Sequence, residues 1–537
     1  MLTMLNSLSP YYPLVPLAVL VMTLLVVMLT ITWQRVHFII GTLTALGLNM
    51  ALLVLVMQMT GFWQIDVPES INTHLFVFDR FAWFNGVVIL LCALACTSFT
   101  YGYFETFEDQ IEEMYLLILT ATIGAILMPA ANHLAALFMS LELLSVPLYG
   151  MLSYAFGRRP SLEAGLKYLV LSATASATLG RGMALVFAST GTLSLHEMHQ
   201  MMMNGGIDSL LMVGIAMMVF AAAFKLSAAP FHQWTPDVYE GAPVPVSTYI
   251  ATVSKVAVMA VMLRFFIGSG AIYVTSVQSL LMVIASLSIL FGNLLALRQT
   301  NIKRLLAYSS IAHIGYALVM LVSVQEVASA LASMYMAMYA LSSIGLFGVV
   351  ALLSSPYKAR GEAVELVHYH GLFWHRPVLT AVMTMMLLSL AGIPLTAGFI
   401  TKFYTLLSAV QGGQWFLAGM IVLGSAIGLY YYLRVLITLY QRPSQYPILL
   451  AKQQGDVTVS STAVSSTAVS STAVSLNQRG QIDHNDPVST KHLIFDVPMT
   501  WGVQFGGLVL VGVTLIIVYF GVLPSQLIEW SMLIMLR

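Results

Sequence analysis

The chain has 537 residues, of which 59% are hydrophobic and only 8% charged, and its 22 basic and 22 acidic side chains give a formal net charge of zero. An ordinary soluble domain is about one quarter charged, and a water-soluble core stops growing near about 300 residues. The apolar excess must therefore face lipid, which predicts a membrane protein. No Lys/Arg-rich tract is present, so the sequence does not support nucleic-acid binding.

Windows of about 20 apolar residues, long enough to cross the hydrocarbon layer, predict an all-α polytopic protein with fourteen transmembrane helices. The first apolar run has no basic residue before it and no small-residue cleavage pattern after it, so we predict a membrane span rather than a signal peptide. The predicted spans cover residues 11–33, 37–60, 82–103, 113–130, 132–156, 161–188, 207–239, 245–267, 273–296, 301–323, 327–354, 371–408, 414–438 and 501–523.

Basic residues fall mainly on one side of these spans when the chain alternates across the membrane. Because cytoplasmic loops are rich in Lys and Arg, we predict that both termini face away from the cytoplasm. The other side carries Arg80, Arg264 and Arg537. The predicted cytoplasmic side carries Arg35, Arg158, Arg159, Arg298, Lys303, Arg304, Lys358, Arg360, Arg376, Arg434, Arg442, Lys452, Arg479 and Lys491.

Two of the predicted spans contain a helix break. In the seventh span Pro230 follows Lys225, and in the twelfth Gly392 and Pro394 precede Lys402. Proline removes an amide donor and clashes with the preceding turn, and backbone freed in this way at membrane depth is tolerated only inside protein or beside a water-filled cavity. Broken helices in both halves of the chain therefore predict an ion path.

A short internal similarity supports two repeated units, because Arg158 with Leu166 to Tyr168 resembles Arg298 with Leu306 to Tyr308. A low-complexity loop follows the second unit and holds three copies of Ser-Thr-Ala-Val-Ser at 461–475. The predicted organisation is N-terminal helices 1–3 at 1–110, a first five-helix repeat at 111–268, a second at 269–440, the loop at 441–500 and a last helix at 501–537.

Ionised side chains at mid-bilayer depth cost at least about 2.5 to 3.5 kcal/mol each, so each one is a functional hypothesis. Burial lowers a lysine's pKa and a nearby carboxylate raises it, so a lysine between these influences can change protonation when its partner moves. We therefore predict a proton relay in which Glu142 pairs with Lys225; the alternative is a set of static salt bridges. The charged members of the relay are Glu142, Lys167, Lys225, Lys255 and Lys402.

Two histidines extend this relay. His232 follows the first break and can pass a proton between Lys225 and Lys255, because imidazole titrates near neutral pH; the alternative is that it satisfies the broken backbone. His313 is predicted to act similarly in the second half. Arg181 lies near the outer end of its span, where snorkelling to the membrane surface is expected.

At these residues the sequence closely resembles the N subunit of bacterial proton-pumping NADH:quinone oxidoreductase, an antiporter-like subunit of the respiratory complex I family. The resemblance spans nearly the whole chain. It is carried by Asn132-His133-Leu134, Leu141-Glu142-Leu143, the stretch from Phe224 to Pro243, Ser254-Lys255, Gln299 to Ser310, Gly371 to Pro377, Ser389 to Pro394 and Lys402-Phe403-Tyr404.

The resemblance implies fourteen helices with two inverted five-helix repeats, each holding a half-channel, in the bacterial inner membrane. It matches the family's buried glutamate and lysines to the charged relay residues, and its histidine to His232. It also implies neighbouring antiporter-like and other membrane-arm subunits as partners. This sequence departs from the family at Arg181, where an apolar or aromatic residue is usual, and in the repeated loop.

The sequence itself shows no redox centre. Cys92 and Cys96 lie four residues apart in an apolar run and are predicted to pack as helix residues, and neither a dinucleotide fingerprint nor a haem-attachment motif is present. The resemblance implies that the whole complex uses NADH, FMN, iron–sulfur clusters and quinone, and these are expected in partner subunits. Two other functions stay open, a cation/proton antiporter subunit and a structural spacer of the membrane arm.

Overall fold

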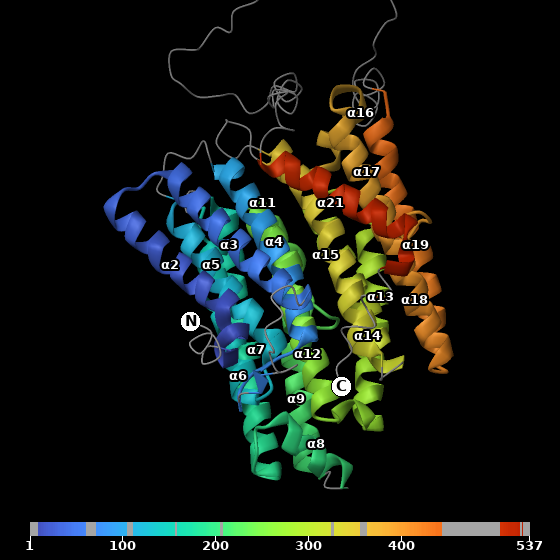
Figure 1. Cartoon of the computed structure of the whole chain (residues 1–537). Coiled ribbons are helices and arrows are strands. Elements are labelled where there is room, and N and C mark those ends of the chain that lie inside the picture. The colour runs from blue at the N-terminus through green and yellow to red at the C-terminus, as the bar shows by residue number, and fades with distance from the viewer. Residues whose placement is uncertain are drawn as a thin grey trace, which may run out of the picture.

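The computed structural model describes residues 9–60, 71–72, 74–104, 111–155, 158–204, 208–323, 327–354, 362–442, 505–526 and 529. Within these residues the chain is almost entirely helical, and the helices pack side by side in one bundle (Figure 1). Two short antiparallel strands, β1 (Ile71–Asn72) and β2 (Val77–Phe78), are the exception there. The repeated Ser-Thr-Ala-Val-Ser segment lies outside the described residues.

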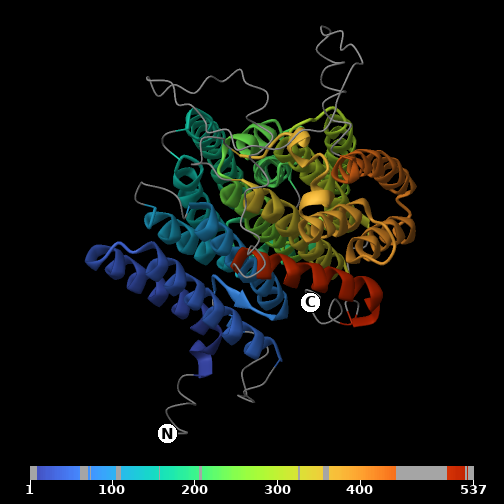
Figure 2. The ribbon, with the colours of Figure 1, turned by 90° about the horizontal axis from the view of Figure 1, so that it is seen from above.

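The first part of the bundle consists of helices that run up and down before the first break. They are η1 (Ser9–Leu14), α2 (Val15–Trp33), α3 (His37–Thr60), α4 (Arg80–Phe104), α5 (Glu113–Leu127), η2 (Met128–Ala130), α6 (Leu134–Leu152), α7 (Arg159–Thr190) and α8 (Leu195–Met203). Seen from above, α2 and α3 lie along one edge of the bundle (Figure 2).

The remaining helices include both breaks and the last predicted span. They are α9 (Ser209–Leu226), α10 (Trp234–Gly241), α11 (Val244–Tyr249), the π-helical turn η3 (Ile250–Ser254), α12 (Lys255–Gly268), η4 (Ala271–Tyr273), α13 (Thr275–Ala296), α14 (Ile302–Ser323), α15 (Ala328–Leu353), η5 (Leu366–Tyr369), α16 (Leu372–His375), α17 (Pro377–Ala391), α18 (Ala397–Gln411), α19 (Trp415–Tyr440) and α21 (Phe505–Val522). Helix α21 runs obliquely across α4, α15 and α18 (Figure 1).

Twelve helices among the described residues are long and apolar enough to cross a membrane, which confirms the predicted all-α polytopic class. Each of the other two predicted spans also overlaps a helix: 371–408 becomes the two half-helices α17 and α18, and 501–523 contains α21. The count of fourteen spans, the inverted repeats and the domain boundaries stay predictions.

Burial separates a central group of helices from a peripheral one. In their apolar windows, 94% of the residues are buried in Ile302–Ser323 and Ala328–Leu353, against 22% in Tyr12–Trp33 and 33% in Arg159–Thr190. Helices α14 and α15 thus lie in the protein core, as does the equally buried segment Val244–Gly268, whereas α2 and α7 leave apolar faces for lipid or for neighbouring helices.

Both breaks end a helix with a residue in the left-handed region. Ser227 has φ 64° after α9, and Gly392 has φ 80° after α17. The amides that follow turn back onto the helix: Ala228 N donates to Ala223 O at 2.7 Å, and Gly392 N donates to Leu388 O at 3.0 Å. These bonds satisfy some of the carbonyls that a helix end leaves free, so each half-helix can stop inside the bundle.

Candidate functional site

Lys225 is the last basic residue of α9, directly before the first break. It is 5% exposed. Its Nζ donates to Ser145 Oγ on α6 and to Ser172 Oγ on α7, each at 2.7 Å. The ammonium group is therefore held by hydroxyl groups, which can both accept and donate a hydrogen bond.

Glu142 lies on α6 and is half-buried. Its carboxylate accepts a hydrogen bond from Ser176 Oγ. Ser176 and Ser172 lie one turn apart on α7, so the acid and Lys225 each contact their own hydroxyl group on the same helix. Among the described residues Glu142 and Lys225 form no ion pair within 4.0 Å, because α7 presents a serine to each group, and the predicted charge pair between them stays a prediction.

Lys255 begins α12 directly after the π-helical turn η3, and its relative exposure is 0%. Its Nζ donates to Ser310 Oγ on α14 at 2.7 Å and lies 5.8 Å from the ring centroid of Tyr239 on α10. A π-helical turn inserts an extra residue into a helix and is frequent at functional sites. Lys255 is thus a fully enclosed lysine at the meeting point of α10, α12 and α14.

His232 lies in the first break and is 9% exposed. Its ring stacks on Phe291 of α13 with centroids 6.2 Å apart. Its Nδ1 is buried and, within the described part of the chain, has no hydrogen-bond partner. No described hydrogen bond joins the imidazole to Lys225 or Lys255.

Lys402 lies on α18, beyond the second break. Its Nζ donates to Ala391 O, the last residue of α17, at 3.1 Å and lies 5.4 Å from the ring centroid of Tyr316. A Cβ atom added at Gly392 would lie 2.7 Å from Lys402 Cδ, so the glycine makes room for the lysine chain. The lysine borders a small cavity lined by His313, Tyr335, Met338, Tyr339, Ser342, Ser389, Leu390, Gly398 and Thr401.

His313 on α14 lies across this cavity from Lys402. It is 4% exposed, and both ring nitrogens contact phenols: Nδ1 is 2.7 Å from Tyr335 OH, and Nε2 is 3.3 Å from Tyr432 OH. Tyr432 OH in turn contacts Ser309 Oγ. The second break therefore faces a connected group of neutral polar side chains.

Lys167 on α7 differs from the lysines described above. Its side chain is 42% exposed and forms ion pairs with Glu163 at 2.7 Å and with Asp237 at 3.0 Å. The expectation of a buried Lys167 is wrong for the isolated chain, because this lysine projects from the part of α7 that the bundle leaves uncovered. Arg181 on the same helix is also exposed.

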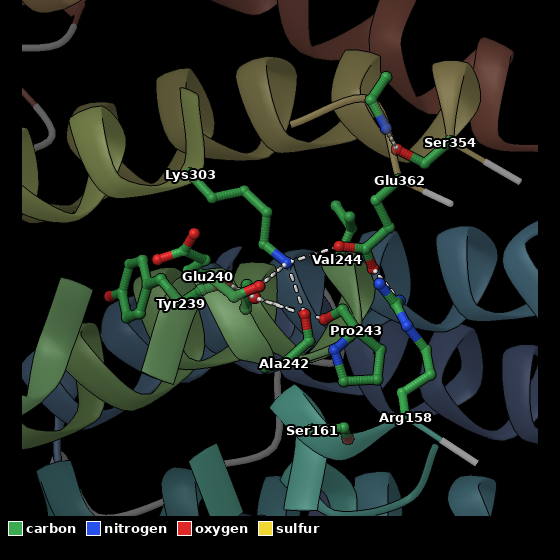
Figure 3. A network of polar contacts seen from close by, with 12 residues as sticks. Arg158, Ser161, Tyr239, Glu240, Ala242, Pro243, Val244, Lys303, Ser354 and Glu362 are labelled. Atoms are coloured by element: carbon green, nitrogen blue, oxygen red, sulfur yellow. Dashed lines mark hydrogen bonds and ion pairs between the residues drawn. The ribbon is translucent and has the colours of Figure 1, made fainter. Parts of the chain in front are cut away.

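Sequence reasoning missed a buried charge cluster at the start of α14 (Figure 3). It placed Lys303 at the cytoplasmic end of the span 301–323 and treated Glu142 as the buried acid, but the side chains of Lys303 and Glu362 are 0% and 2% exposed. Their Nζ and Oε2 atoms are 2.8 Å apart. The adjacent Lys303 and Arg304 were a visible signal of a charged site in the sequence. Glu362 lies in a loop 59 residues after Lys303, and nothing in the sequence indicated that the two side chains pair.

The cysteines and acidic residues form no metal site among the described positions, where no group of three or more His, Cys, Asp or Glu side chains could hold an ion. Cys92 and Cys96 are buried free thiols on α4. Residues 131–428 match the family model described as NADH:quinone oxidoreductase/Mrp antiporter, TM. This matched region contains both breaks and all the predicted relay residues.

Curated relatives decide the family. A protein of Psychrobacter arcticus named NADH-quinone oxidoreductase subunit N is 53% identical over 528 residues, covering 98% of each chain. The chain belongs to the NADH-quinone oxidoreductase subunit N family. A subunit N protein of Acinetobacter baumannii is 50% identical over 441 residues, covering 82% of this chain and 88% of its own length.

Solved structures share the fold of this chain. A chain of respiratory complex I from Thermus thermophilus superposes with TM-score 0.73 at 27% identity and covers 96% of this chain and 98% of that one. A chain of an archaeal membrane-bound sulfane sulfur reductase gives 0.78 at 20% identity, with coverages of 98% and 96%. A chain of the Mrp complex from Dietzia gives 0.77 at 19% identity, with coverages of 99% and 97%, so these two show a shared fold alone.

Proposed function

We propose that this subunit N protein is a proton-translocating member of the membrane arm of NADH:quinone oxidoreductase. The main support for this function is a set of three lysines, Lys225, Lys255 and Lys402. Their ammonium groups contact hydroxyl groups, an aromatic ring or a backbone carbonyl. Among the described residues none of the three forms an ion pair within 4.0 Å. An enclosed ammonium group without a carboxylate partner can lose its proton at a lower cost than a paired one.

The first break supplies positions at which water can join these lysines. Ser227 Oγ, His232 Nδ1 and Thr235 Oγ1 are buried and have no hydrogen-bond partner in the described part of the chain. Buried polar atoms rarely stay unpaired, and ordered water commonly supplies the missing partner. A short file of water molecules along the break would connect His232 with Lys225 on one side and with Lys255 on the other.

Redox chemistry belongs to other subunits in this proposal. NADH, FMN, iron–sulfur clusters and quinone are held by partners, and quinone reduction there drives charge changes along the lysines of this chain. Neighbouring antiporter-like subunits continue the path on either side. The complex lies in the bacterial inner membrane, and both termini of this chain face the periplasm because the basic loops stay in the cytoplasm.

The test uses the assembled complex in inverted membrane vesicles. Lys225→Met should lower NADH:quinone reductase turnover and the proton gradient together, with subunit incorporation checked on a native gel. Normal pumping by an assembled Lys225→Met complex would instead favour a structural spacer. A requirement for Na⁺ in transport by the wild-type complex would favour the cation/proton antiporter.

A further inference from the structure

Lys303, at the start of α14, contacts both the end of α10 and the segment that follows α15 (Figure 3). Its Nζ donates to three acceptors: Glu362 Oε2 at 2.8 Å, Glu240 O at 2.9 Å and Ala242 O at 2.5 Å. The two carbonyls lie at the end of α10, the half-helix that follows the first break. A cation at the C-terminus of a helix satisfies free carbonyls and interacts favourably with the helix dipole.

Glu362 completes this arrangement from the segment that follows α15. Its Oε1 accepts from Tyr103 OH on α4 and pairs with Arg158 at 3.2 Å. Burial raises the pKa of the Glu362 carboxyl, but the charges of Lys303 and Arg158 outweigh that effect and hold the pKa below its usual value. Glu362 is therefore a charged anchor to which α4, the start of α7 and α14 are all tied.

A second, more exposed set of contacts joins α10 to the start of α14. Asn301 Nδ2 donates to Glu240 Oε1 at 3.1 Å. Arg304 pairs with Asp237 at 2.9 Å and with Glu240 at 2.7 Å. Helix α10 has only eight residues, too few to be stable alone, so its position depends on these contacts with the start of α14.

Helices α10 and α14 also supply both described contacts of the Lys255 ammonium group. Tyr239 belongs to α10 and directly precedes Glu240. Ser310 lies seven residues after Lys303 on α14, about two turns along the same face. A shift of α10 against α14 would therefore move the tyrosine ring and the serine hydroxyl relative to Lys255.

We infer that Lys303 is a positioning residue: together with Glu362 it clamps α10 against α14. The clamp holds Tyr239 and Ser310 at Lys255, and it does so without carrying a proton itself. Because this role concerns the predicted relay lysine, it rests on the proposed function. Lys303→Met should lower coupled turnover at least about tenfold in a complex that still assembles, since removing one partner of a buried pair is strongly disruptive.

Replacement of the clamp by a covalent bridge separates positioning from proton transfer. Glu240→Cys and Arg304→Cys place thiols at two side chains that contact each other and are 42% and 28% exposed. In the Lys303→Met background, a short bifunctional methanethiosulfonate should join the two cysteines and restore at least about half the turnover of the double-cysteine complex that retains Lys303. Dithiothreitol should reverse the rescue.

The native thiols do not compete in this chain, because Cys92 and Cys96 are buried. Complexes with only one introduced cysteine control for reagent effects on other subunits. A bridge that forms, as shown by mass, but leaves the Lys303→Met complex inactive would overturn the positioning role and assign Lys303 to proton transfer. Full activity of Lys303→Met without a bridge would overturn any role for Lys303.

Arg264 provides a matched control for loss of a buried charge. It pairs with Asp79 at 2.6 Å, its side chain is 6% exposed, and it contacts neither α10 nor α14 through that pair. Arg264→Met should not gain turnover from the 240–304 bridge. Lys255→Met tests the proposed function separately: normal pumping by that variant would refute the relay, whereas failure of the bridge alone would refute only the clamp.

Discussion

Lys225 and Lys402 lie beside the two helix breaks, yet the groups around them differ in kind. Lys225 donates to two serines, and the carboxylate of Glu142 is held one helix turn away by a third serine. Lys402 donates to a backbone carbonyl at the break and faces His313 and tyrosines across a small cavity. The first site has an acid in its neighbourhood, and the second has neutral polar groups.

This difference indicates two ways of controlling a buried proton. A change in charge or position of Glu142 alters the electrostatic environment of Lys225 directly, because an interaction between charges is strong where water is scarce. The proton on Lys402 depends instead on how the carbonyl, the imidazole and any water are arranged. We therefore expect the first half to respond to charge and the second half to respond to geometry.

Removal of Lys402 should have the largest effect, since the cavity offers no second lysine. Lys402→Ala should reduce turnover and proton translocation together, by about tenfold or more, because a tightly coupled pump cannot finish its cycle with the predicted exit group missing. Lys402→Arg should also be impaired, since arginine keeps the charge but does not release its proton. Quinone-reductase rate and ΔpH are measured in the same vesicles. An Arg variant that assembles and pumps normally would show that only a fixed positive charge is needed.

Neutralisation of Glu142 should have the next largest effect and should be confined to the first half. Glu142→Gln keeps an oxygen that can accept from Ser176 but removes the negative charge near Lys225. We expect coupled turnover to fall about threefold to tenfold, with normal assembly. Pumping at the wild-type rate in this variant would remove the distinction between a charge-controlled and a geometry-controlled half.

Much of this comparison could be predicted from the sequence, but the partners of the lysines could not. Hydropathy located the spans and proline located the breaks, because both depend on residues close together in the chain. The contact between Lys225 and Ser145 joins residues 80 positions apart, and that between Lys303 and Glu362 joins residues 59 apart. Such pairs depend on how helices pack. For the same reason the sequence did not show which face of α7 is exposed, and Lys167 was expected to be buried.

Loss of a single serine should have a smaller effect that depends on the half in which it lies. Ser172→Ala removes one hydrogen bond to Lys225, and such a bond contributes about 1 kcal/mol, so turnover should fall about fivefold. Ser389→Ala is the matched change near Lys402: this serine lines the cavity and contacts Ser342, not the ammonium group. It should change turnover less than Ser172→Ala does. The reverse order would mean that hydroxyl groups matter more in the second half.

Deletion of residues 460–475 should leave assembly and turnover unchanged, so it serves as the reference against which the other variants are compared. This segment consists almost wholly of three identical Ser-Thr-Ala-Val-Ser copies, which contain no titratable side chain, and it lies in the long polar loop predicted to stay outside the bilayer. A proton path through Lys225 and Lys402 does not need it. Native-gel assembly, quinone-reductase rate and ΔpH should match the wild-type complex. The control is a replacement of the same length with scrambled Ser, Thr, Ala and Val. Loss of assembly on deletion but not on replacement would show that the loop must be long enough to reach a partner. Loss of assembly in both variants would show that a partner recognises the repeated sequence itself.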